Sequence, residues 1–124
     1  MVSCLLVDED GIERLRLAKI LDGLGFECSE SDGLVEAVNF VHTSKPELIL
    51  INASEQTPAQ EFLRLMKCGS REQFQPIVIF YANAPKMDAM GASILAGASD
   101  FLIQPFDSQI LKFKLQQAGF KLAA

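Results

Sequence analysis

The sequence predicts an α/β fold: one doubly wound domain over residues 1–124, with a five-stranded parallel sheet and helices on both faces. Two observations support this prediction. Short continuous apolar runs alternate five times with segments that carry a helical apolar face. Polar or acidic residues stand directly after these runs. Because strands that alternate with helices need crossover connections, and right-handed crossovers give parallel neighbours, a parallel sheet follows.

The first half of the chain contains three expected strands. They lie at residues 3–7, 26–30 and 48–51, and the last is the strongest pattern of a strand buried on both faces. A helix is expected between the first two strands. Asp10 is its candidate N-cap, with Glu three residues later, and Gly25 is a candidate C-terminal cap in the left-handed conformation. A second helix must end before the proline at position 46 because that residue disfavours helix before it.

The second half repeats this rhythm. Strands are expected at residues 77–80 and 101–103, with a helix over about 86–96 between them. Asp107 or Ser108 can cap the last helix. The apolar positions that predict the remaining helices are Leu34, Ala37, Val38 and Val41, then Phe62, Leu63, Leu65 and Met66, then Ile110, Leu111, Phe113 and Leu115. We expect Phe113 to belong to the core.

Composition excludes several classes of function. The chain has 11 Lys and Arg against 16 Asp and Glu, a net charge of -5, and no basic run, so nucleic acid is not expected as a partner. No apolar run is long enough to span a membrane, and no signal peptide is visible. Cys4, Cys28 and Cys68 lack the spacing of a metal site and are interpreted as reduced thiols of a cytoplasmic protein.

Five polar side chains are expected to converge at one edge of the sheet. Five strands of this length suit the order 2-1-3-4-5, whose ligand crevice lies beyond the carboxyl ends of the first and third strands. The residues that follow the strands are Asp8, Glu9, Asn52, Tyr81 and Gln104. We expect Tyr81 to pack with its hydroxyl at the rim.

Three segments resemble the receiver domain of two-component response regulators, the CheY-like family with a flavodoxin-like fold. Residues 5–10 (LLVDED) are similar to its first strand and acid cluster, and residues 46–52 (PELILIN) to its third strand and phosphorylation position. Residues 97–106 (GASDFLIQPF) are similar to its fifth-strand signature. The resemblance covers nearly the whole chain.

The resemblance implies phosphoryl transfer from a histidine kinase to an aspartate, assisted by Mg²⁺. In this chain Asp8 and Glu9 take the metal positions, and Asn52 takes the position of the phosphoacceptor. Tyr81 replaces a short hydroxyl residue, and Gln104 replaces a lysine.

Three further positions follow from the resemblance. Phe101 stands at the aromatic switch position, and the Gln104–Pro105 bond matches a cis Lys-Pro bond. The backbone carbonyl of Ser54 could complete a metal shell.

Three replacements predict that the phosphorylation reaction is lost. The neutral amide of Asn52 cannot form a stable acyl phosphate. The ring of Tyr81 should fill the space for the phosphoryl group, and Gln104 cannot neutralise developing charge. We expect at most weak Mg²⁺ binding by Asp8 and Glu9, because Asn supplies no charge to the ion. The sequence therefore predicts a pseudo-receiver: no enzyme, no required cofactor, and no effector domain in the chain.

Output is expected through protein–protein contact with a signalling protein. Candidate partners are a histidine kinase, a phosphotransferase, a downstream regulator or a second copy of the chain. The expected surface is the face formed by the fourth helix, the fifth strand and the last helix. It includes Met87, Phe101, Ile103, Lys112 and Lys114.

Other interpretations stay open at this point. The chain could accept a phosphoryl group with Mg²⁺ on Ser54, Asp8 or Glu9. A flavodoxin-like cofactor binder shares the strand order, although the acids at positions 8–10 would repel a phosphate. The same acids also suit plain helix capping and a solvated rim.

Overall fold

The computed structural model describes residues 2–53, 59–67, 75–83 and 97–122. The strands are β1 (Val2–Val7), β2 (Phe26–Ser31), β3 (Leu48–Asn52), β4 (Ile77–Asn83) and β5 (Asp100–Gln104). The helices are α1 (Gly11–Gly23), α2 (Leu34–Ser44), α3 (Ala59–Lys67) and α5 (Ser108–Gln117). The helix expected over 86–96 lies outside the described residues.

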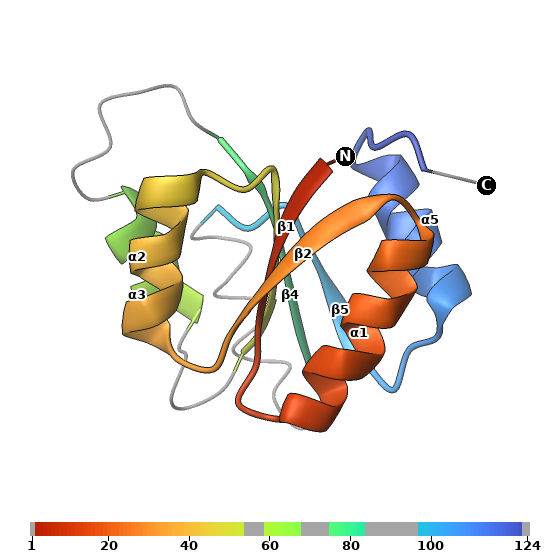
Figure 1. The fold of residues 1–124 in the computed structure, drawn as a ribbon, viewed down its shortest axis with the longest axis horizontal. Coiled ribbons are helices and arrows are strands. Elements are labelled where there is room, and N and C mark those ends of the chain that lie inside the picture. The colour runs from red at the N-terminus through yellow and green to blue at the C-terminus, as the bar shows by residue number, and fades with distance from the viewer. Residues whose placement is uncertain (1, 54–58, 68–74, 84–96, 123–124) are drawn as a thin grey trace.

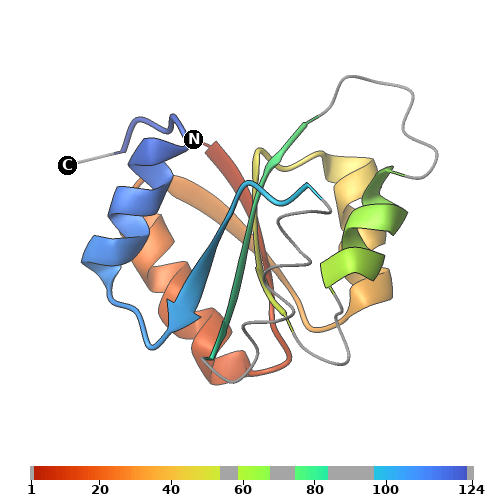
Figure 2. The ribbon, with the colours of Figure 1, turned by 180° about the vertical axis from the view of Figure 1, so that it is seen from behind.

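The five strands form one parallel sheet in the order β2-β1-β3-β4-β5, which confirms the predicted topology. Helices α2 and α3 cover one face, and α1 and α5 cover the other (Figures 1 and 2). Strands β1 and β3 lie in the interior of the sheet, and their apolar runs are buried on both faces. This arrangement brings the carboxyl ends of β1, β3 and β4 to one edge.

Two clusters of buried side chains hold the layers together. The cluster under α2 and α3 contains Val7, Ile51 and Phe80, while the cluster under α1 and α5 contains Leu6, Leu50 and Tyr81. The alternation follows from the period of two along a strand, which sends successive side chains to opposite faces. Tyr81 therefore points to the α1 and α5 side of the sheet.

Local capping signals position the helices as predicted. The carboxylate of Asp10 accepts hydrogen bonds from the backbone N–H groups of Ile12 and Glu13 at the start of α1. Gly25 follows α1 with a φ of 97°, in the left-handed region that glycine adopts without strain. Asp107 caps α5 by accepting a hydrogen bond from Ile110 N at 2.9 Å.

Two sequence expectations are corrected. Strand β4 extends to Asn83 rather than ending at position 80, so Tyr81 lies inside the strand and not after it. Asn52 and Gln104 were likewise expected after their strands but are the last residues of β3 and β5. Phe113 is 57% exposed, because Leu111 and Leu115 form the buried face of α5. In the part of the chain that is described, no helix has the length and apolar character to cross a membrane.

Candidate functional site

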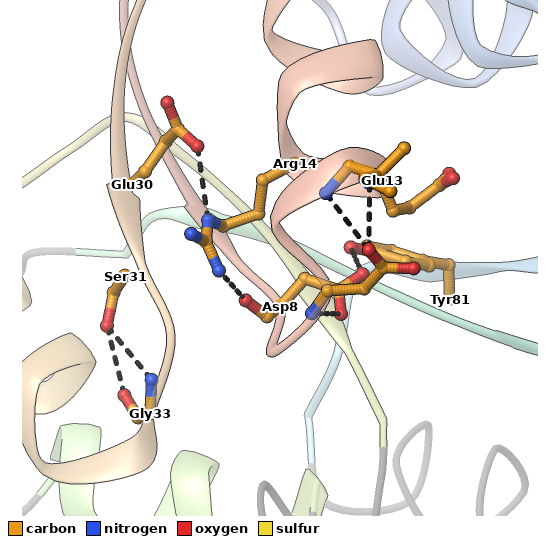
Figure 3. A network of polar contacts seen from close by, with 9 residues as sticks. Asp8, Glu13, Arg14, Glu30, Ser31, Gly33 and Tyr81 are labelled. Atoms are coloured by element: carbon orange, nitrogen blue, oxygen red, sulfur yellow. Dashed lines mark hydrogen bonds and ion pairs between the residues drawn. The ribbon is translucent and has the colours of Figure 1, made fainter.

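Asp8 is a buried carboxylate at the carboxyl end of β1. Its side chain is shielded so that the residue is only 6% exposed, and its backbone N–H donates to the carbonyl of Ser31 at 3.1 Å. The backbone N–H of Asp10 donates to Asp8 Oδ1 at 2.9 Å. The turn between β1 and α1 therefore folds back on the carboxylate and uses one of its oxygens (Figure 3).

The other oxygen of Asp8 is used by Tyr81. The Tyr81 hydroxyl donates to Asp8 Oδ2 at 2.6 Å, a short charge-assisted geometry. Tyr81 comes from β4 and Asp8 follows β1, so the bond reaches across β3 (Figure 3). Tyr81 is 0% exposed, so the expectation of a hydroxyl at the rim is wrong. The hydroxyl points inward because a buried acceptor is available there.

Aromatic packing fixes the ring of Tyr81. The ring of Phe106, which follows β5, meets it edge-on, with centroids 5.9 Å apart and planes at 74°. The Arg16 guanidinium lies 5.5 Å from the centroid of the same Phe106 ring. Arg16 is in turn paired with Glu13, at 2.5 Å between Nη2 and Oε1. Glu13 and Arg16 of α1 therefore hold Phe106 against the ring of Tyr81.

Burial shifts the titration of both partners. Desolvation raises the pKa of Asp8, and the hydrogen bonds from Tyr81 and from the backbone of Asp10 offset only part of that shift. Desolvation also raises the pKa of Tyr81, and the hydrogen bond to the Asp8 carboxylate adds to it because a phenolate there would face a negative charge. The phenol is therefore held as a neutral donor.

Arg14 is part of the site, and sequence reasoning missed it. Its Nη1 donates to the backbone carbonyl of Asp8, and its Nε donates to Glu30 Oε1 at 3.1 Å. These contacts join α1, the end of β1 and β2 (Figure 3). The sequence contains one indication of this role. Arg14 stands one helical turn after the N-cap Asp10, and this spacing places its long side chain near the carboxyl end of β1.

Asn52 and Tyr81 share one level of the sheet, while Gln104 does not. Asn52 ends β3 as a half-buried residue and is the register partner of Tyr81. The register partner of Tyr81 on β5 is Leu102, and Gln104 pairs with Asn83, two residues farther along. Five residues were predicted to converge at this edge of the sheet. Asp8 and Tyr81 are in contact, and Asn52 lies beside Tyr81 as its register partner on β3.

The remaining predicted positions are spread around this core of the site. Glu9 is exposed, and Ser54 lies outside the described residues. The Gln104–Pro105 bond is cis, and Pro105 is exposed. Phe101 is half-buried, and Lys114 Nζ lies 6.0 Å from its ring centroid.

The donor set at this edge fits Mg²⁺ poorly. Magnesium prefers carboxylate oxygens in octahedral geometry, and each oxygen of Asp8 already accepts one hydrogen bond from the protein, which leaves it one lone pair for an ion. Asn52 offers a neutral amide in place of a carboxylate. Among the described residues, no group of three or more His, Cys, Asp or Glu is arranged to hold a metal ion.

Comparison with known proteins identifies the relatives of this chain, although no protein-family model matches it. The chain is 29% identical over 103 residues to the DNA-binding transcriptional regulator NtrC of Klebsiella pneumoniae, covering 82% of this chain and 21% of NtrC. It is 26% identical over 119 residues to the chemotaxis protein CheY of Pseudomonas aeruginosa, covering 94% of each. The structure of the receiver domain of NtrX from Brucella abortus aligns with a TM-score of 0.81 and 20% identity, over 93% of this chain and 96% of that one.

The NtrX structure that aligns with this chain is a receiver domain, and the two curated relatives are a transcriptional regulator and a chemotaxis protein. The chain therefore shares the fold of that receiver domain. The chain spans about a fifth of the length of NtrC and nearly all of CheY.

Proposed function

We propose that this chain is a receiver-like module of two-component signalling that acts through protein–protein contact and does not itself accept a phosphoryl group. The relationship to response-regulator receiver domains supports the signalling role. Asn52 supports the second part, since an amide is no nucleophile for phosphoryl transfer. We place its action in the cytoplasm, in keeping with its reduced thiols.

The hydrogen bond of 2.6 Å between Tyr81 and Asp8 is the observation that carries this proposal. An active receiver site would need an ionised, accessible acid cluster and open space for a phosphoryl group. Here the acid is buried, each of its oxygens accepts a hydrogen bond from the protein, and an aromatic ring occupies the approach from β4. Opening the site would leave a buried donor or acceptor without a partner, which costs about 1–3 kcal/mol.

The same contacts argue against phosphoryl acceptance by Asp8 with Mg²⁺. Each oxygen of the Asp8 carboxylate already accepts a hydrogen bond, which makes it a weaker nucleophile. Any Mg²⁺ binding is proposed to be weak, because the ion would have to compete with these bonds and with the neutral Asn52.

The contact surface we propose runs along β5 and α5. Its members are Phe101, Ile103, Ile110, Phe113 and Lys114, and we call it the α5–β5 surface. Lys114 Nζ is 3.1 Å from Asp100 Oδ1, which places this side of α5 beside the edge strand β5. Ile110 is one turn before Lys114, and Phe113 is three residues after Ile110.

Exposure makes the α5–β5 surface a suitable docking face. Ile103, Ile110 and Phe113 are 38%, 45% and 57% exposed, although all three are large apolar side chains. Large exposed apolar side chains near an edge strand are typical of an interaction site. Met87, which was expected on this face, lies outside the described residues. The partner we propose is another signalling protein of the same system: a histidine kinase, a phosphotransferase, a downstream regulator or a second copy.

Phosphodonor treatment tests the proposal. The native chain is incubated with acetyl phosphate and Mg²⁺, and its intact mass is measured. We expect no phosphoryl adduct. The double variant Asn52→Asp with Gln104→Lys should also stay unmodified, because Tyr81 still binds Asp8. The triple variant that adds Tyr81→Thr is the matched control and should gain one phosphoryl group. A phosphoryl adduct on the native chain would overturn the proposal.

A further inference from the structure

Two cysteines lie side by side on neighbouring strands. Cys4 of β1 and Cys28 of β2 are direct register partners in a parallel pair. Neighbouring strands are about 4.8 Å apart, which lies within the Cα separation of about 4.4–6.8 Å that a disulfide requires. Paired residues of parallel strands direct their side chains to the same face, and both cysteines pack in the cluster under α1 and α5.

The two thiols differ in accessibility. Cys4 is 1% exposed, whereas Cys28 is half-buried and sits on β2, which is an edge strand of the sheet. The proximity of Cys4 lowers the pKa of Cys28, although burial and the charges of Asp22 and Glu30 oppose the shift. The proximity of Cys28 and burial raise the pKa of Cys4. Cys28 is thus the more reactive and more accessible sulfur, with a second sulfur held beside it.

We propose that Cys4 and Cys28 form a peroxide-reactive dithiol, in which Cys28 is oxidised first and Cys4 resolves it to a disulfide. The Cys28 thiolate attacks one oxygen of a hydroperoxide, the O–O bond breaks, and the departing oxygen takes up a proton to leave as water or an alcohol. Cys28 is then a sulfenic acid. The Cys4 sulfur attacks the Cys28 sulfur, the S–O bond breaks, and the oxygen leaves as water with the Cys4 proton. The two sulfurs lose two electrons, and the peroxide gains them.

This site goes beyond the proposed signalling function, because it needs neither a phosphoryl group nor a partner protein. The disulfide would tie the edge strand β2 to β1, directly behind the site, since β1 leads into Asp8 and the Asp8 N–H donates to the last residue of β2, Ser31. Because Cys4 is the register partner of Cys28, formation of the disulfide competes with further oxidation of the sulfenic acid.

Peptide mapping tests the pair directly. The reduced native chain is treated with hydrogen peroxide, free thiols are alkylated, and the protein is digested with trypsin, which cleaves between the two cysteines after Arg14, Arg16 and Lys19. We expect a linked peptide that joins Cys4 to Cys28 and a loss of two of the three alkylatable thiols. Dithiothreitol should restore both thiols.

Variants separate a specific pair from general oxidation. Cys68→Ser should form the same link at the same rate, whereas Cys28→Ser should form none and should leave Cys4 alkylatable. When the wild-type chain is unfolded in urea before oxidation, disulfide formation should lose its selectivity, and disulfides that contain Cys68 should appear. The inference is overturned if the folded native chain stays reduced, if its disulfide contains Cys68, or if Cys28 accumulates as a sulfinic acid without any link to Cys4.

Discussion

The site around Asp8 and the α5–β5 surface are built in opposite ways. At the Asp8 site, polar groups that could react or bind an ion are turned inward and satisfied by one another: Asp8 is 6% exposed and Tyr81 0% exposed. At the α5–β5 surface, apolar side chains that could fill a core are turned outward, with Phe113 57% exposed. A satisfied polar site and an exposed apolar face both support the proposed role as a binding module.

The two regions should also differ in how their side chains affect folding and the proposed partner binding. Tyr81 contributes a buried ring, a hydrogen bond and an aromatic contact, so its removal should disturb folding. Phe113 and Ile110 stay 57% and 45% exposed and lie outside the buried face of α5, so their removal should disturb folding much less than removal of Tyr81.

Truncation of the two aromatic side chains should give the largest difference between the regions. Tyr81→Ala should lower the free energy of unfolding by about 3–5 kcal/mol, because it leaves a cavity and an unpaired Asp8. Phe113→Ala should change it by less than about 0.5 kcal/mol. Urea unfolding with a common slope measures both values. Equal losses in the free energy of unfolding would contradict the view that Tyr81 stabilises the fold and Phe113 does not.

Removing only the hydroxyl should give a smaller loss at the same site. Tyr81→Phe keeps the ring and its contact with Phe106, yet it leaves Asp8 Oδ2 without its donor. We expect a loss of about 1–3 kcal/mol in the free energy of unfolding. The double variant with Asp8→Asn should lose less than the sum of the single variants, because the two residues interact directly. Full additivity would argue that the hydrogen bond contributes nothing.

Charge on the α5–β5 surface should weaken partner binding without unfolding the chain. Ile110→Asp places a carboxylate among exposed apolar groups and should reduce affinity for the partner about tenfold or more. Ile12→Asp is the matched control, because Ile12 is a still more exposed isoleucine, 83%, on α1. Isothermal titration with purified partner, or sedimentation if the partner is a second copy, measures the difference. A similar loss for both variants would place the contact elsewhere.

The smallest expected effect is the dependence of stability on alkaline pH that arises from Tyr81, the sole tyrosine. The fold raises the pKa of Tyr81 above its ordinary value of 10.0, so this group contributes stability that is present below that value and is lost as the pH rises above it. Absorbance of tyrosinate should therefore appear only as the chain unfolds. Tyr81→Phe should lack this alkaline loss of stability. Titration of the folded native chain near pH 10 would mean that the hydroxyl reaches solvent.

Much of the fold could be predicted because local signals and the global topology agree. The run at 48–51 reads as a strand buried on both faces, and Asp10 and Gly25 delimit α1 by capping geometry alone. The parallel sheet follows from the alternation of elements, and its strand order is a common one for doubly wound folds. The end of β4 was missed, because Tyr81 was interpreted as a loop residue although β-propensity favours a tyrosine in a strand.

The details of the site depended on contacts that a sequence pattern does not contain. Whether the Tyr81 hydroxyl points out or in is decided by Asp8 and Phe106, which are distant in sequence. The exposure of Phe113 was missed because apolar residues occupy more than one face of α5, so periodicity does not say which face meets the sheet. The role of Arg14 depends on Glu30, brought near by β2.

Beryllium fluoride binding tests the closure of the Asp8 site most directly, because this phosphoryl mimic needs an aspartate, a metal ion and open space at the same place. Fluorine NMR of the native chain with beryllium fluoride and Mg²⁺ should show only free fluoride species. The triple variant of Asn52→Asp, Tyr81→Thr and Gln104→Lys should show a bound signal under the same conditions. A bound, Mg²⁺-dependent fluoride signal on the native chain would contradict a site closed by Tyr81 and Asp8.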